Sequence, residues 1–167
     1  PIASPDFELG PPGVEATEIA RIVDRGIRES KAVDFKKLCI KSGEKCWLFF
    51  IDIYPMNDDG NLIDASALGA LAALKNTRFT KLVNDKPVFG EFTDKKVELD
   101  KLPITFTFVK IGKGILLDPH TREEKAAEAR LSVAVYNGKI HAMQKGGNKG
   151  FSESEIEMML DIAIKKE

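Results

Sequence analysis

The sequence predicts an α+β fold in which helices cover a largely antiparallel sheet. Apolar residues recur at helical spacing over residues 14–30, and a capping box marks the start of a helix over residues 152–165. Between them, segments of alternating apolar and polar residues are joined by turn residues, most clearly at Asn137-Gly138. Strands joined by tight turns pair antiparallel. Because the apolar faces of the helices and of the sheet must be buried, we expect the helices to pack on the faces of that sheet.

The first helix is predicted from Val14 to about Ser30. The residues of its apolar face are Ile19, Ile22, Val23 and Ile27, and those of a second, basic face are Arg21, Arg25 and Arg28. Asp24 with Arg28 and Arg25 with Glu29 are opposite charges four residues apart, which predicts two ion pairs along the helix.

A buried central strand is predicted next. Residues 33–40 read as a loop or short edge strand and residues 41–45 as a polar turn, whereas residues 46–54 are almost continuously apolar. Such a run is typical of a strand buried on both faces. Cys39 and Cys46 lie among these apolar residues, which predicts two buried, reduced thiols, with a disulfide as the alternative.

A second helix, the main strands and a final helix follow. Asp64 is a good N-cap for the helix ASALGALAALKN, whose small residues predict close packing against a sheet. Strands are predicted at 81–83, 88–92, from 104 to a turn at 112–114, and at 115–118, 130–136 and 139–145. Ser152 and Glu155 form a capping box for the last helix.

Size and charge limit the function classes. The chain has 167 residues, 43% of them hydrophobic, which suffices for one globular domain with a sizeable core. The net charge of −1 provides no general attraction for nucleic acid, so any RNA contact must use a local basic cluster. No apolar run approaches the roughly 18 residues of a membrane span, and no signal peptide is visible, so we predict a cytoplasmic protein without a membrane partner.

The stretch NDDGNLIDASALGALAAL, residues 57–74, has the backbone pattern of an anion-binding site but lacks a positively charged side chain. A tight turn ends at Gly60 and a helix begins shortly afterwards, so backbone N–H groups at the helix start can cradle an anion. Yet the stretch contains no Arg, Lys or His before Lys75.

The acidic segment LDPHTREEKAAEAR, residues 117–130, has two interpretations. It groups four carboxylates with a histidine: Asp118, Glu123, Glu124, Glu128 and His120. These residues suit a metal or acid–base site for phosphoryl transfer, but they equally suit a charged turn and short helix. The spacing matches no closed ligand motif, and the two histidines of the chain do not indicate a His-based metal site or any cofactor.

The basic residues also have two interpretations. The arginine face of the first helix is either a solvated face or a track for phosphate groups, since guanidinium groups match phosphate oxygens in pairs. The segment QKGGNKG, residues 144–150, could wrap phosphates or simply connect a hairpin to the last helix.

Three ordered segments resemble the RNase PH family: EIARIVDRGIRESKAVD, IDIYPMNDDGNLIDASALGALAAL and LLDPHTREEKAAEARLSVAV. More narrowly, they resemble the non-catalytic RNase PH-like ring subunits of the archaeal exosome. The resemblance runs from about Ser4 to Ile164 and implies an RNase PH-like (ribosomal protein S5 domain 2-like) fold. Family members carry a strand-rich portion ahead of PDFELGPP, so residues 1–167 are expected to form a partial RNase PH-like domain that lacks its N-terminal strands.

The resemblance singles out four positions. Active members cleave RNA from its 3′ end with inorganic phosphate, and the arginine that holds this phosphate corresponds to Ile63. A second phosphate-handling arginine corresponds to Glu15. Two aspartates six residues apart correspond to Asp118 and Glu124. Three of the four positions therefore depart from the active pattern, which argues against independent catalysis.

The resemblance thus implies a non-catalytic subunit of the exosome, a phosphate-dependent 3′-to-5′ exoribonuclease ring that degrades and processes RNA. Its implied partners are a catalytic RNase PH-like subunit that alternates with it in a hexameric ring, RNA-binding cap subunits and single-stranded RNA. We predict RNA contact at Arg21, Arg25 and Arg28. The alternatives are an active phosphorolytic exoribonuclease that uses Asp118 and Glu124, or a purely structural ring module.

Overall fold

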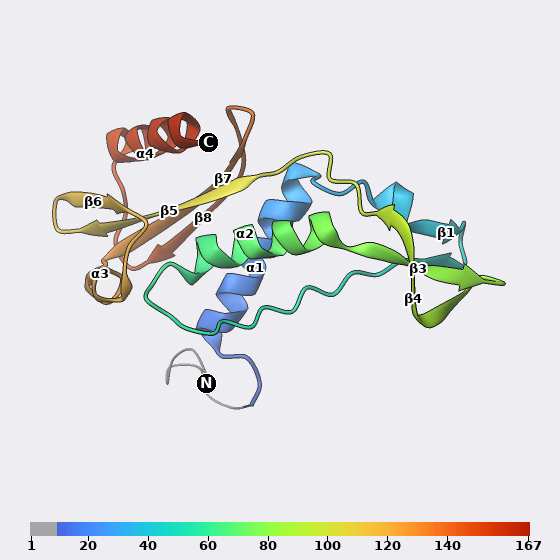
Figure 1. Cartoon of the computed structure of the whole chain (residues 1–167). Helices are drawn as coiled ribbons and strands as arrows, with labels where there is room; N and C mark the ends of the chain where they lie inside the picture. Colours follow the sequence, from blue (N-terminus) through green and yellow to red (C-terminus); the bar gives the residue numbers. More distant parts are fainter. Residues whose placement is uncertain (1–9) are drawn as a thin grey trace.

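The computed structural model describes residues 10–167; Ser4 and the other residues of the first nine, where the resemblance begins, lie outside this part (Figure 1). The elements are α1 (Val14–Ser30), η1 (Phe35–Leu38), β1 (Cys39–Lys41), β2 (Lys45–Cys46), α2 (Leu62–Asn76), β3 (Arg78–Val83), β4 (Lys86–Lys96), β5 (Ile104–Ile111), β6 (Gly114–Leu117), α3 (Thr121–Ala126), β7 (Ala129–Tyr136), β8 (Lys139–Gly147) and α4 (Glu153–Lys166). Among these residues, no helix combines the length and apolar character that crossing a membrane requires.

A four-stranded antiparallel sheet in the order β6-β5-β7-β8 lies between helices, which confirms the predicted α+β class. Alternate residues of β7 face opposite sides. Leu131 and Val133 pack with Met159 of α4 in one core cluster. Ser132 and Ala134 face the other side of the sheet, which α1 and α2 cover. The predicted hairpins and the capping box of α4 are therefore confirmed.

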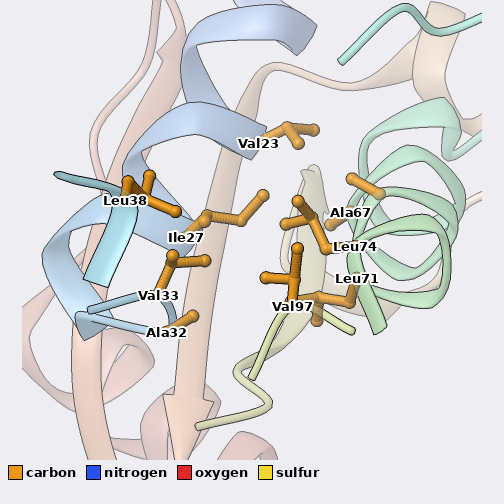
Figure 2. Packing of buried hydrophobic residues seen from close by; sticks show 10 residues of the cluster. Val23, Ile27, Ala32, Val33, Leu38, Ala67, Leu71, Leu74 and Val97 are labelled. Carbon is orange, nitrogen blue, oxygen red and sulfur yellow. The ribbon is translucent and has the colours of Figure 1, made fainter. Parts of the chain in front are cut away.

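A second core cluster packs α1 and α2 together with Ala32, Val33, Leu38 and Val97, away from the four-stranded sheet (Figure 2). Its buried members are Val23, Ile27, Ala32, Val33, Leu38, Ala67, Ala70, Leu71, Leu74 and Val97. Figure 1 shows α1 and α2 between the four-stranded sheet and the small β1–β2 and β3–β4 sheets. The predicted apolar face of α1 is thus confirmed, and it connects both halves of the fold.

The strand predicted over residues 46–54 is wrong for the described part of the chain. Only Lys45–Cys46 pairs, and the following residues run extended without a strand partner. Trp47, Phe49 and Ile53 pack against the α1–α2 core, whereas residues between them point outward, with Phe50 79% exposed. Side chains alternate over most of the segment, with Ile51 as the exception, but the partners that would bury the outer row are absent from residues 10–167.

Two smaller predictions also need correction. The side chain that caps α2 is Asn61, not Asp64, because the Asn61 Oδ1 accepts the backbone N–H of Asp64. The small residues of α2 do not all pack closely: Gly69 has open space around it, and Leu68 is exposed. The two cysteines are free, as expected, but they are exposed rather than buried, since the β1–β2 hairpin lies at the surface.

Candidate functional site

Two turns meet where α2 begins. Gly60 has φ +97°, and a Cβ atom at this position would lie 2.6 Å from the Cα of His120. The backbone N–H of Thr121 donates to the carbonyl oxygen of Asp59 at 3.2 Å. Only glycine allows this approach, so the turn that precedes α2 and the segment that leads into α3 are held as one unit.

Asn61 connects the acidic residues of both turns. Its Nδ2 donates to Asp118 Oδ1 at 2.6 Å and to Asp64 Oδ2 at 2.9 Å. Its backbone N–H donates to Glu124 Oε1 at 3.0 Å. Asn61 itself is buried and has φ +49°, a left-handed conformation that asparagine tolerates better than most residues. One residue, through its side chain and its backbone N–H, thereby fixes the relative positions of three carboxylates.

Asp64 is further held by the sheet. Its carboxylate accepts the backbone N–H of Thr107 at 2.8 Å and the Thr107 hydroxyl at 2.7 Å, and that hydroxyl lies 2.9 Å from the hydroxyl of Ser132. Burial raises the pKa of Asp64 from 3.8 to about 6, against these hydrogen bonds and with help from the nearby charge of Asp118.

This raised pKa predicts that acid strengthens the fold at Asp64. The folded state binds the proton more tightly than the unfolded chain, so the stabilisation is full below pH about 4 and is lost as the pH rises through about 6. We expect the stability advantage of the wild type over Asp64→Asn to shrink by up to about 3 kcal/mol between pH 4 and pH 7. Denaturant unfolding across this range measures it, and a difference that does not change with pH would contradict the expectation.

A small acidic hollow lies beside this network. It is lined by Glu15, Glu18, Ile19, Asp58, Leu62, Ile63, Glu124 and Arg130. Its volume of about 20 Å³ is little more than one water needs. Burial, followed by the charges of Asp58 and Glu15, raises the pKa of Glu124 although Asn61 donates to it. The small volume of the hollow and the negative charge of its lining both disfavour a phosphate ion here.

Arg130 is the cation of the acidic hollow. Its Nη2 lies 2.6 Å from Glu18 Oε1, outside hydrogen-bond geometry, and Nε and Nη2 are buried without a hydrogen bond to the described residues. Gly146 of β8 makes room for the guanidinium, since a Cβ there would lie 2.9 Å from Nη2. Among the described lining residues, the one positive group therefore faces a carboxylate of α1.

The structure brings together the four positions that the sequence singled out. Glu15, Ile63 and Glu124 line the acidic hollow, where Ile63 is only 3% exposed. Asp118 lies outside it, on a neighbouring hollow of about 300 Å³ that also contains Asp64, and Asn61 bridges the two. Asn61 therefore links Asp118 to Glu124, and Glu124 shares its hollow with Glu15 and Ile63.

Comparison with known proteins assigns the family. Residues 1–80 match the 3′ exoribonuclease family, domain 1, and residues 101–166 match domain 2 of the same family. The chain belongs to the RNase PH family. Both matches agree with the fold, in which the first segment contributes α1 and α2 and the second contributes the four-stranded sheet and α4.

Among curated relatives, the RNase PH chain is similar to two proteins called Exosome complex component Rrp42. Identity is 46% with that of Methanosarcina acetivorans and 47% with that of Methanocella arvoryzae, over 99% of this chain and 61% and 62% of theirs. The chain thus spans about three fifths of these relatives.

Solved structures give the same result. A structure described as the Archaeoglobus fulgidus exosome with RNA bound to the active site is similar at TM-score 0.88 and 41% identity, over 99% of this chain and 64% of that one. An archaeal exosome core is similar at TM-score 0.80 and 39% identity, over 90% and 60%.

The three arginines of the basic face of α1 differ in their surroundings. Arg21 is exposed. Arg28 pairs with Asp24 at 3.0 Å, as predicted, on an exposed surface. Arg25 does not form the predicted pair with Glu29; it is half-buried, and its Nη1 donates to Gln144 Oε1 of β8 at 2.8 Å. β8 therefore positions one of the three side chains.

The remaining charged motifs have structural partners. His120 is the N-cap of α3 and accepts the backbone N–H of Arg122 on Nδ1, so the segment 117–130 contains the charged turn and short helix that were one of its two interpretations. In the segment 144–150, Lys149 pairs with Glu128 at 2.6 Å and Lys145 bonds the carbonyl of Gly147. Within residues 10–167, no three His, Cys, Asp or Glu side chains are grouped to hold a metal.

Sequence reasoning missed Asn61, Thr107 and Arg130 as members of the site. Asn61 and Thr107 act through contacts across elements, which no local pattern indicates. Arg130 had one available signal, since it is the one charged residue near the start of a mostly apolar strand.

Proposed function

We propose that this RNase PH chain is a non-catalytic subunit of an exosome ring, a phosphate-dependent 3′-to-5′ exoribonuclease. One observation carries the proposal: the hollow lined by Glu15, Ile63 and Glu124 has room for little more than a water and is acidic. An attacking phosphate needs space and unpaired positive groups, whereas this hollow is small and its described positive residue, Arg130, already faces Glu18. The names of the Rrp42 relatives and of the similar exosome structures support the same assembly.

The proposed partner is a catalytic RNase PH-like subunit that alternates with this chain in a hexameric ring, with RNA-binding cap subunits above it. Exposed apolar residues support assembly. The largest of them on the described surface include Leu48, Phe50, Tyr54, Met56, Phe89 and Phe92. Such an exposed apolar surface is typical of subunits that are buried in a permanent complex. The predicted cytoplasmic location belongs to this proposal.

The isolated chain should show no phosphorolysis, and Ile63→Arg should not create any. The new guanidinium would lie in a tightly filled position and face Glu15 and Glu124. These carboxylates would pair with it, so its charge would not be available to phosphate. Release of nucleoside diphosphates from single-stranded RNA plus phosphate is the measurement. The same assay after co-purification with a catalytic RNase PH-like subunit is the positive control.

Turnover by the isolated chain would instead favour the alternative of an active enzyme that uses Asp118 and Glu124. Turnover that appears only in Ile63→Arg would show that this one residue had silenced the site. Failure to co-purify with any catalytic RNase PH-like subunit would overturn the ring assignment.

RNA contact is proposed at Arg21, Arg25 and Arg28. Arg21 is free to reach a phosphate, and Arg25 is held one helical turn away by Gln144. Arg21→Ala with Arg25→Ala should weaken RNA binding by the assembled ring for all sequences alike. The salt slope should flatten by about two units at most, and somewhat less for single strands.

RNA affinity at several salt concentrations tests this, with the mass of the ring measured in parallel. Lys165→Gln with Lys166→Gln is the matched control, because it removes two positive charges from α4 on the other face of the sheet. Unchanged affinity and slope in an intact double-arginine variant would favour a purely structural module.

A further inference from the structure

The two cysteines of the chain face each other across the β1–β2 hairpin. Cys39 of β1 is the register partner of Cys46 of β2. Both thiols are exposed, and neither is in a disulfide. Seven of the eight residues from 39 to 46 are exposed, so small molecules have access to the pair.

Backbone hydrogen bonding places this pair at a position suited to cross-linking. The N–H of Trp47 donates to the carbonyl oxygen of Leu38 at 2.8 Å, so the residues inside this bond, Cys39 and Cys46, form a non-hydrogen-bonded pair. In such pairs the Cα atoms are about 4.5 Å apart and the side chains are close. Disulfides span Cα separations of about 4.4–6.8 Å, so the strands need not move apart or slide to form one.

We propose that Cys39 and Cys46 are a redox modification site that forms a reversible intramolecular disulfide by exchange with a low-molecular-weight disulfide. One cysteine thiolate attacks that disulfide, forms a mixed disulfide and releases the first small thiol. The second cysteine thiolate then attacks the protein sulfur of the mixed disulfide and releases the second small thiol. Two electrons pass from the cysteine pair to the small disulfide, and two protons leave the protein thiols.

The surroundings favour a bond that is easily reversed. The separation lies at the short end of the range for disulfides, and bonds away from the preferred geometry are more readily reduced. The pair is also exposed, and exposed disulfides belong to the labile class.

The site is placed to act on the apolar segment that follows it. Leu38 and Trp47 flank the two cysteines; Leu38 is buried in the α1–α2 core and Trp47 packs against that core. Oxidation would therefore restrict backbone motion at the start of residues 47–56. This is the extended segment whose outward-facing apolar residues have no described partner.

The experiment incubates the purified chain with glutathione disulfide and then alkylates the remaining thiols. We expect the free thiols to fall from two to none, with loss of two hydrogen atoms from the mass and no dimer. Trypsin cuts after Lys41 and Lys45, between the cysteines, so the product should be a linked pair of peptides, residues 38–41 and 46–75, that separates on reduction. Excess reduced glutathione should restore both thiols.

Lys45→Cys with Cys46→Ser is the matched control, because it moves one thiol by a single residue and thus to the opposite side of the strand. At the same glutathione ratio, this variant should form about tenfold less internal disulfide. Equal internal disulfide in wild type and control would overturn the proposal, and so would wild-type thiols that stay free, carry only glutathione or link two chains.

Discussion

Gly60→Ala should destabilise the chain by about 3 kcal/mol or more. The backbone at Gly60 has φ +97°, which a residue with a Cβ rarely adopts. The new Cβ would also lie 2.6 Å from the backbone of both His120 and Pro119, so the clash cannot be relieved by rotating a side chain. Separating the two turns would break the contacts of Asn61 with Asp118 and Glu124.

Denaturant unfolding of both proteins at one pH measures this loss. Gly90→Ala is the matched control, because Gly90 has φ +80° but a Cβ there would meet nothing within 4 Å. The control should lose only about 1–2 kcal/mol from its backbone conformation. If Gly60→Ala lost no more than Gly90→Ala, the close approach of the two turns would have no energetic importance.

Arg130→Met should be the second large effect, a loss of about 2 kcal/mol at neutral pH. Breaking a buried ion pair costs about 3–5 kcal/mol, and we expect less here because 22% of the Arg130 side chain is exposed. The substitution keeps the apolar stem but leaves Glu18 unpaired beside the carboxylates of Glu15, Asp58 and Glu124. The pKa of Glu124, which Arg130 lowers, should rise further.

Unfolding at neutral pH and again near pH 4 separates the charge from the packing. Protonation of Glu124, whose pKa is raised, should reduce the difference between wild type and variant in acid. Lys149→Met is the control, since its pair with Glu128 is equally short but Lys149 is exposed, and such pairs contribute about 1 kcal/mol or less. A loss in Arg130→Met that is the same at both pH values would indicate packing alone.

Local patterns predicted most of the fold. The helical repeat of apolar residues located α1 within its observed bounds, and the turn residues located the hairpins of β5–β8. The prediction failed for residues 46–54 because an apolar run indicates only a tendency to form a strand. Whether the strand forms depends on another strand that pairs with it. The same run led to the wrong expectation for the cysteines, whose exposure follows from the position of a short hairpin.

For the candidate site, the sequence singled out positions that the fold brings close together, but it did not indicate their connections. Glu15, Ile63 and Glu124, which the resemblance singled out one by one, line the same hollow. That Asn61 joins the acidic turns depends on the left-handed backbone after Gly60, which the sequence does not display. That Arg130 fits beside Glu18 depends on the missing side chain of Gly146, which lies on the neighbouring strand.

The outward row of the segment 47–56 has a practical consequence for the behaviour of the chain at high concentration. Its residues from Trp47 to Tyr54 combine aromatic and β-branched side chains with a single charge, Asp52. Extended segments of this composition that lack a strand partner pair readily with copies of themselves. We therefore expect the purified chain to aggregate as its concentration rises, and Phe50→Lys, which places a charge in the exposed row, to raise its solubility limit.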